Sequence, residues 1–145
     1  MTPRTFFAAA VCGLVLLGCT SALPRVATTA DCRAQECRVA VSVTTSVPAV
    51  CRATTVPSTL HVRSRGASVI AWDLEAASEH AGYRFPPNGI VFNDPQGEFD
   101  CQSANQGMKF MCNNKHSKSG DYKYTVNVVR GSTSCIPLDP MIIND

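Results

Sequence analysis

Apolar and polar side chains alternate with a period of two along most of the chain from residue 38 onward. Val39, Val41 and Val43 alternate with polar or small residues in the first such segment, and the most regular example covers residues 122–128. Successive side chains of a β-strand point to opposite faces of a sheet, so this period is typical of half-buried strands. The pattern predicts β-structure through most of the chain.

Turn-forming residues divide the pattern into short segments of strand length. The breaks fall at Pro48, Pro57, 64–66, 86–89 and 93–97. Residues 74–82 are the one stretch that favours a helical turn, with Gly82 as its cap. Roughly seven to nine short strands with almost no helix indicate an all-β, antiparallel β-sandwich. Immunoglobulin-like and cupredoxin-like topologies both fit this pattern, and Trp72, on an apolar position of a central strand, is expected in the core.

Residues 1–18 have the pattern of an export signal. Arg4 is followed by an uncharged apolar stretch from Phe6 to Leu17, which matches the n-region and h-region of a signal peptide. About a dozen apolar residues are too few for a membrane-spanning helix, which needs ~20. The segment therefore predicts a leader and not a transmembrane anchor.

The sequence Leu16-Leu-Gly-Cys19 resembles the lipobox of bacterial lipoproteins, although a smaller residue than Leu17 is commoner at its position. The resemblance implies a signal peptide over 1–18, a lipidated N-terminus and flexible tether over 19–31, and a domain over 32–145. In this interpretation Cys19 carries the lipid. The alternative is ordinary cleavage after Ala22, which leaves a periplasmic or secreted protein.

Thr20 follows Cys19 where lipoproteins of enteric type that stay in the inner membrane have aspartate. The resemblance therefore implies that the protein is anchored in the outer membrane of a bacterial envelope. Acyl chains bury CH₂ groups worth ~0.8 kcal/mol each, so two or three chains hold a protein stably. The protein is therefore expected to contact the membrane through the lipid and not through its folded domain.

The chain has eight cysteines, of which Cys12 lies in the leader and Cys19 is assigned to lipid. The remaining six are Cys32, Cys37, Cys51, Cys101, Cys112 and Cys135. An even number in an exported chain predicts three disulfides, and an unmodified Cys19 would leave an odd thiol. The connectivity stays open, but Cys101 and Cys112 sit at matching ends of a possible hairpin and are the expected pair.

A blue-copper site is the most specific metal-binding hypothesis that the sequence offers. Residues 110–120 (FMCNNKHSKSG) resemble the closing loop of blue-copper proteins, with Cys112 as thiolate and His116 as imidazole. His61 or His80 would supply the second imidazole. No methionine follows His116 before the last strand, and the cysteine count places Cys112 in a disulfide, so no metal or other cofactor is expected and copper remains the alternative.

Zinc needs clustered ligands at short spacings, and Cys32 and Cys37 have no companion pair.

A general base needs an oriented partner and a nucleophile within hydrogen-bond reach. The charged residues close together in sequence are Asp73, Glu75, Glu79 and His80. No catalytic motif surrounds them, so a loop of mixed charge is expected and no enzyme is predicted.

The chain has 13 Lys and Arg against 11 Asp and Glu, without a run of one sign. A nucleic-acid partner requires a clustered basic face and is not expected. One set of lysines flanks a single predicted loop, Lys109, Lys115, Lys118 and Lys123. These side chains could approach anionic headgroups or glycans, although solvated lysines are the simpler interpretation.

Several scaffold motifs follow one another after residue 68. They are Ile70-Ala-Trp72-Asp-Leu74, Gly82-Tyr-Arg-Phe85, Gly89-Ile-Val-Phe92, Gly120-Asp-Tyr-Lys-Tyr-Thr-Val-Asn-Val128 and Leu138-Asp-Pro-Met-Ile-Ile-Asn144. With them the chain resembles a family of small exported bacterial proteins of unknown function. The resemblance implies a β-sandwich in the envelope and brings no activity with it.

These observations predict a non-enzymatic envelope lipoprotein whose loops, at one end of a disulfide-linked sandwich, bind an envelope protein or a surface polymer. The alternative is a periplasmic copper-binding or redox protein of cupredoxin type that uses Cys112 and His116.

Overall fold

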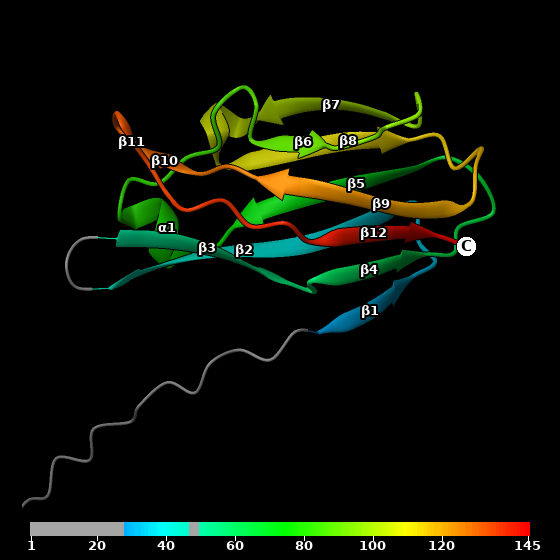
Figure 1. The fold of residues 1–145 in the computed structure, drawn as a ribbon, viewed down its shortest axis with the longest axis horizontal. Helices are drawn as coiled ribbons and strands as arrows, with labels where there is room; N and C mark the ends of the chain where they lie inside the picture. Colours follow the sequence, from blue (N-terminus) through cyan, green and yellow to red (C-terminus); the bar gives the residue numbers. More distant parts are fainter. Residues whose placement is uncertain (1–27, 47–49) are drawn as a thin grey trace, which may run out of the picture.

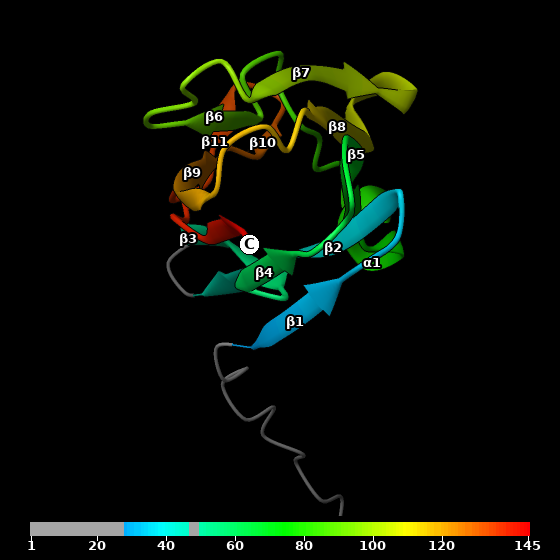
Figure 2. The same cartoon turned by 90° about the vertical axis from the view of Figure 1, so that its right-hand side faces the viewer.

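The computed structural model describes residues 28–46 and 50–145. The strands form two five-stranded sheets, and a separate two-stranded hairpin lies at one end (Figure 1). The two sheets pack face to face, and a view along the strands shows them as two facing layers (Figure 2). The all-β sandwich predicted from the alternation is confirmed.

The first sheet has the order β1-β4-β12-β9-β6. Its strands are β1 (Thr29–Cys32), β4 (Thr59–Val62), β12 (Met141–Asn144), β9 (Gly120–Val126) and β6 (Ile90–Phe92). β4 runs parallel to both of its neighbours, β1 and β12. β9 is antiparallel to β12 and to β6.

The second sheet has the order β3-β2-β5-β8-β7. Its strands are β3 (Val50–Val56), β2 (Glu36–Ser46), β5 (Ser68–Leu74), β8 (Lys109–Asn114) and β7 (Phe99–Ala104). β2 and β5 are parallel, and the other pairs are antiparallel. The short hairpin consists of β10 (Val129–Arg130) and β11 (Thr133–Ser134).

Both sheets are therefore mixed, whereas the sequence pattern predicted antiparallel sheets. β4 and β5 are consecutive in the chain but lie in different sheets, because the turn over residues 63–67 crosses the sandwich instead of forming a hairpin. Each strand then pairs with a strand that is distant in sequence. Alternation reports which face of a strand is buried and not which strand lies beside it.

The domain also begins earlier than the predicted boundary at residue 32. Residues 29–31, expected in the tether, belong to β1, which pairs with β4 from Thr29 to Cys32. Ala30 and Cys32 pack against the core, since they point to the buried face of the strand. The predicted signal peptide and Cys19 lie outside the described residues.

Aromatic side chains join the two sheets through the core. Trp72 is fully buried, as predicted, and its Nε1 donates a hydrogen bond of 3.1 Å to the hydroxyl of Tyr124 on the opposite sheet. The two rings meet edge to face with centroids 5.3 Å apart. Burial raises the pKa of the Tyr124 phenol far above its ordinary value. Phe92 of β6 stacks on Phe99 of β7 at 3.8 Å between centroids, which closes one side of the sandwich.

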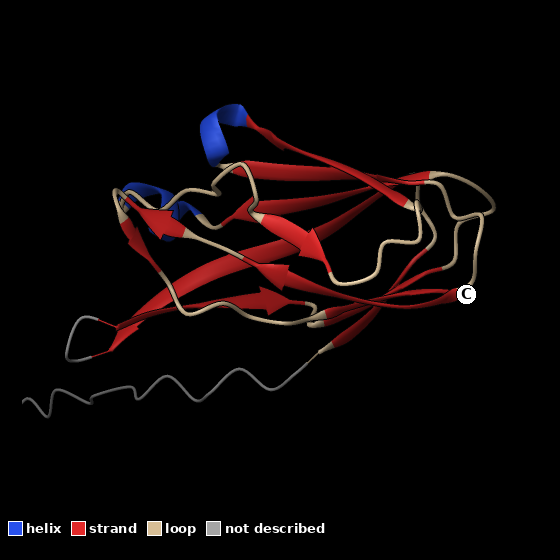
Figure 3. Cartoon of the chain, turned by 45° about the horizontal axis from the view of Figure 1, so that its top comes forward, coloured by secondary structure: helices blue, strands red, loops and turns tan. Residues whose placement is uncertain are grey.

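Among the described residues, helical structure is short and confined to one end, where α1 (Ala76–His80) and the 3₁₀ turn η1 (Asn105–Gly107) lie (Figure 3). Gly82 ends α1 as predicted, with φ of +84°. The amide of Gly82 donates to the Glu79 carbonyl, and the amide of Tyr83 donates to the Ser78 carbonyl. These two bonds form a Schellman cap, which favours glycine at the left-handed position.

All six cysteines of the described residues form disulfides, and the predicted Cys101–Cys112 bond between β7 and β8 is confirmed. Cys32–Cys37 links β1 to β2 and so joins the two sheets. Cys51–Cys135 ties β3 to the residue after β11. Three disulfides in so small a domain place its folding in an oxidising compartment, the envelope or the exterior of the cell.

Candidate functional site

The structure does not bring together the ligands of the copper hypothesis. Cys112 is fully buried, and its sulfur is bonded to Cys101, so it offers no thiolate. His116 lies in the β8–β9 loop, whereas His80 belongs to α1 at the opposite end of the sandwich (Figure 1). Across the described ranges 28–46 and 50–145, no three His, Cys, Asp or Glu side chains gather closely enough to hold a metal ion.

Asp73, one of the four charged residues close together in sequence near α1, takes part in ion pairs on the second sheet. Asp73 lies on the outer face of the second sheet, where its carboxylate is 3.6 Å from Arg38 and 3.7 Å from Lys109. Lys109 is also 3.7 Å from Glu36. Asp73 thus pairs with cations on both strands that flank β5, and Lys109 reaches across β5 to Glu36. Partly exposed ion pairs of this kind contribute little to stability.

The predicted lysine set does not form a single patch. Lys109 belongs to the ion pairs on the outer sheet face. Lys115 and Lys118 donate from their ammonium groups to the carbonyls of Gly97 and Gln96, at 2.6 and 3.0 Å. Two of the four lysines therefore hold the neighbouring loop in place.

Glu98 is the anchor of that loop. Its carboxylate is almost fully buried and accepts hydrogen bonds from the hydroxyl and the amide of Ser117 and from the amide of Lys118. The hydrogen bond from the Ser117 hydroxyl is the main cause that lowers the pKa of Glu98, and burial acts in the opposite direction. Loops 93–98 and 115–119 are thus fixed to each other.

A buried amide pair lies beneath these loops. The Asn114 and Asn144 side chains exchange two hydrogen bonds, of 2.8 and 3.1 Å, between β8 and β12. Because β8 and β12 belong to different sheets, the pair ties the two layers together at this end. A reciprocal amide pair satisfies buried polar atoms that would otherwise cost free energy.

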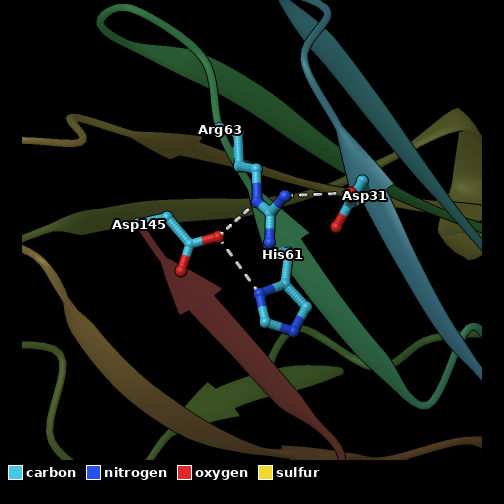
Figure 4. Close-up of polar contacts among 4 residues, drawn as sticks. All are labelled: Asp31, His61, Arg63 and Asp145. Carbon is cyan, nitrogen blue, oxygen red and sulfur yellow. Dashed lines mark hydrogen bonds and ion pairs between the residues drawn. The ribbon is translucent and has the colours of Figure 1, made fainter.

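The same end carries a cluster of four charged or titratable side chains (Figure 4). Arg63 donates from Nε to Oδ2 of Asp145 at 2.6 Å and from Nη1 to Oδ2 of Asp31 at 3.2 Å. Nδ1 of His61 lies 3.1 Å from the same Asp145 oxygen. The hydrogen bond from Arg63, followed by that of His61, lowers the pKa of Asp145, and the contact with Asp145 raises the pKa of Arg63.

Strand register explains why these residues meet. Asp31 of β1 is opposite His61 of β4, and the parallel pairing of β4 with β12 places the last residue, Asp145, beside Val62. Arg63 follows directly after β4, so it lies between the ends of its two neighbouring strands. The cluster is therefore a consequence of parallel pairing at three adjacent strand ends.

Three arginines line a hollow of about 520 Å³ next to this cluster: Arg33, Arg63 and Arg65. Arg33 lies in the short loop closed by the Cys32–Cys37 disulfide. Two backbone hydrogen bonds of 2.7 Å join this loop to the next one, from the Arg63 amide to the Cys32 carbonyl and from the Val69 amide to the Gln35 carbonyl. The two loops that carry the three arginines are therefore joined at their bases.

We use the name charged end for the loops 33–35, 63–67, 93–98 and 115–119 together with Asp145. The sequence contains two hints of it, the pair of arginines around Ser64 and the arginine inside the Cys32–Cys37 loop. Neither hint shows that the two loops touch. That contact depends on the parallel pairing of β1 with β4, which local sequence does not encode.

Comparisons with known proteins leave the family undefined: no protein-family model matches the sequence, and a search of curated proteins finds no relative. In the described part of the chain no helix is long and apolar enough to span a membrane.

Proposed function

We propose that the chain is a non-enzymatic lipoprotein of the bacterial envelope, anchored through Cys19, whose charged end binds an envelope protein or a surface polymer. Three features support the anchor: the apolar leader, the lipobox-like sequence before Cys19, and the pairing of the six downstream cysteines with one another. An unmodified Cys19 kept in the mature chain would be an unpaired thiol in an oxidising compartment.

The observation that carries the binding role is the arginine-lined hollow on a rigid end of the sandwich. Loops that a rigid scaffold displays are the usual place for recognition in such folds. Here the loops are fixed by a disulfide, a buried carboxylate and a buried amide pair. Fixed loops lose little conformational entropy on binding, which favours affinity.

Fractionation of cells tests the anchor. Cys19→Ser is expected to move the protein from the membrane fraction to the soluble fraction without changing its melting temperature, since Cys19 precedes the folded domain. Cys12→Ser, in the leader, is the matched control and should leave the protein in the membrane fraction. Retention of the Cys19→Ser protein with the membranes would overturn the lipoprotein assignment.

Photo-crosslinking in intact cells tests the binding role. A photoreactive amino acid at Ala67, an exposed residue of the charged end, should give a discrete adduct on irradiation. The same group at Ser132, exposed between β10 and β11 at the other end, is the control and should not. Equal adducts at both positions, or none at Ala67, would contradict binding through the charged end.

A further inference from the structure

We propose that the hollow lined by Arg33, Arg63 and Arg65 is a binding site for a phosphate group carried by the partner of the charged end. The inference rests on the proposed function and adds the chemical class of the ligand.

Positive charge in the hollow is only partly balanced. Asp31 and Asp145 both bind Arg63. Within the described ranges, Arg33 and Arg65 have no ion pair. Two exposed guanidinium groups therefore face one hollow without a carboxylate partner, which makes the hollow attractive to an anion. The two carboxylates limit this attraction, because they offset part of the charge of the three arginines.

Arg63 is already oriented before any ligand arrives. Its bonds to Asp145 and Asp31 use two of the five N–H donors of the guanidinium group and leave the others available. An arginine held in this way has lost much of its rotamer freedom in the folded protein, so binding costs less side-chain entropy. Arg63 can thus act as the oriented group of the site, with Arg65 on the same loop and Arg33 on the adjoining one.

A phosphate monoester or pyrophosphate fits three separate arginines better than a carboxylate does. A carboxylate is planar and is satisfied by one or two guanidinium groups, whereas a phosphate group presents three acceptor oxygens in different directions. It also carries a charge of about −1.5 to −2 at pH 7. A hollow of about 520 Å³ leaves room for part of the group that carries the phosphate.

Two sources can present this chemistry in an envelope: a phosphorylated surface polymer and a lipid headgroup. A chain between Cys19 and the first described residue, residue 28, reaches at most about 30 Å at ~3.5 Å per residue. The charged end can therefore meet either source, and the experiment has one arm for each.

The first arm measures binding of inorganic pyrophosphate, with acetate at equal ionic strength as the carboxylate control. The protein is the predicted mature chain, residues 19–145, with Cys19→Ser, which lacks both the apolar leader and the lipid. The double variant Arg33→Gln/Arg65→Gln should lose at least about tenfold in pyrophosphate affinity, because it removes two charge-assisted contacts. Arg52→Gln/Lys123→Gln removes the same charge from exposed positions elsewhere and should bind as the parent does.

The second arm measures sedimentation with phosphatidylcholine vesicles that contain phosphatidic acid, a phosphate monoester, or phosphatidylglycerol, a diester. Binding only to phosphatidic acid, and its loss in the Arg33/Arg65 variant, identifies a headgroup as the source. Pyrophosphate binding without vesicle binding identifies a polymer or a soluble phosphate. Both results support the site.

The site is refuted if pyrophosphate does not bind, if acetate binds equally, or if the control variant loses as much affinity as the Arg33/Arg65 variant. Equal binding to both anionic vesicles also refutes it, because a general negative surface would then be sufficient. The crosslink at Ala67 separates this failure from that of the proposed function. If the adduct persists in the Arg33/Arg65 variant, the charged end is still a binding surface. The partner then does not bind it through a phosphate group at these arginines.

Discussion

The two ends of the sandwich are stabilised by different kinds of interaction. The helix end, which carries α1, η1 and the β10–β11 hairpin, is tied to β3 by the Cys51–Cys135 disulfide. At the charged end the Cys32–Cys37 disulfide closes one loop, and the remaining loops are held by polar contacts, those of Glu98 and Arg63 among them. Covalent bonding does not respond to mild changes in pH or salt, whereas carboxylate contacts do. The comparison indicates that the charged end is the responsive one.

The largest expected effect is at the helix end. The double variant Cys51→Ser/Cys135→Ser should lower the free energy of unfolding by about 4–5 kcal/mol, since the disulfide closes a loop of 84 residues. Urea denaturation of the oxidised protein measures the change. Cys101→Ser/Cys112→Ser, with 11 residues in the loop, should cost only about 3 kcal/mol. Pyrophosphate affinity should be unaffected in the Cys51/Cys135 variant, and a large loss would mean that the two ends are not independent.

The next effect concerns the buried carboxylate of the charged end. Glu98→Ala should cost about 2–3 kcal/mol, because it leaves the hydroxyl of Ser117 and two amides without their acceptor. Asp94→Ala is the control in the same loop, and its exposed side chain should change stability by less than about 0.5 kcal/mol. Equal losses of stability in the two variants would show that Glu98 has no special role in holding the loop.

Acid should weaken the charged end through the same residue. The pKa of Glu98 is lowered in the folded protein, so the stabilisation is complete above the unfolded pKa of about 4.3 and is lost as the pH falls through the folded value. The stability difference between the parent and Glu98→Gln should therefore shrink between pH 7 and pH 3. Urea midpoints at a series of pH values measure this, and a difference that grows in acid would reverse the sign and contradict the interpretation.

The smallest expected effect is on the exposed cluster. Asp31→Asn removes one of the two carboxylates beside Arg63 and should raise pyrophosphate affinity about twofold to fivefold, with little change in melting temperature. Asp100→Asn, an exposed residue of β7, is the charge-matched control and should leave the affinity unchanged. A fall in affinity on Asp31→Asn would show that orientation of Arg63 matters more than its net charge.

Much of the fold could be predicted from the sequence because strand alternation is local. Trp72 in the core, the cap at Gly82 and the Cys101–Cys112 hairpin bond all depend on residues that are close in the chain. Cys32 and Cys37 are also close in sequence, but no predicted hairpin singled out that pair. The parallel pairs, the strand at residues 29–32 and the Cys51–Cys135 disulfide depend on contacts between distant segments. No local pattern distinguishes those contacts from their alternatives.

The charged end was missed for the same physical reason. Asp31, Arg63 and Asp145 come from three parts of the chain, and only the pairing of β4 with both β1 and β12 brings them together. The sequence instead drew attention to Cys112 and His116, because a contiguous segment resembled a known metal loop. The structure explains that segment as a disulfide-linked strand end followed by a loop that Glu98 holds.

A mass spectrum of the mature protein, taken before and after reduction, tests the central claim most directly. The claim predicts a chain that begins at an acylated Cys19 and gains six hydrogen atoms on reduction, two for each of the three disulfides. A chain that begins after Ala22 would contradict the lipid anchor. A free thiol at Cys112 before reduction would contradict the disulfide framework and return copper to consideration.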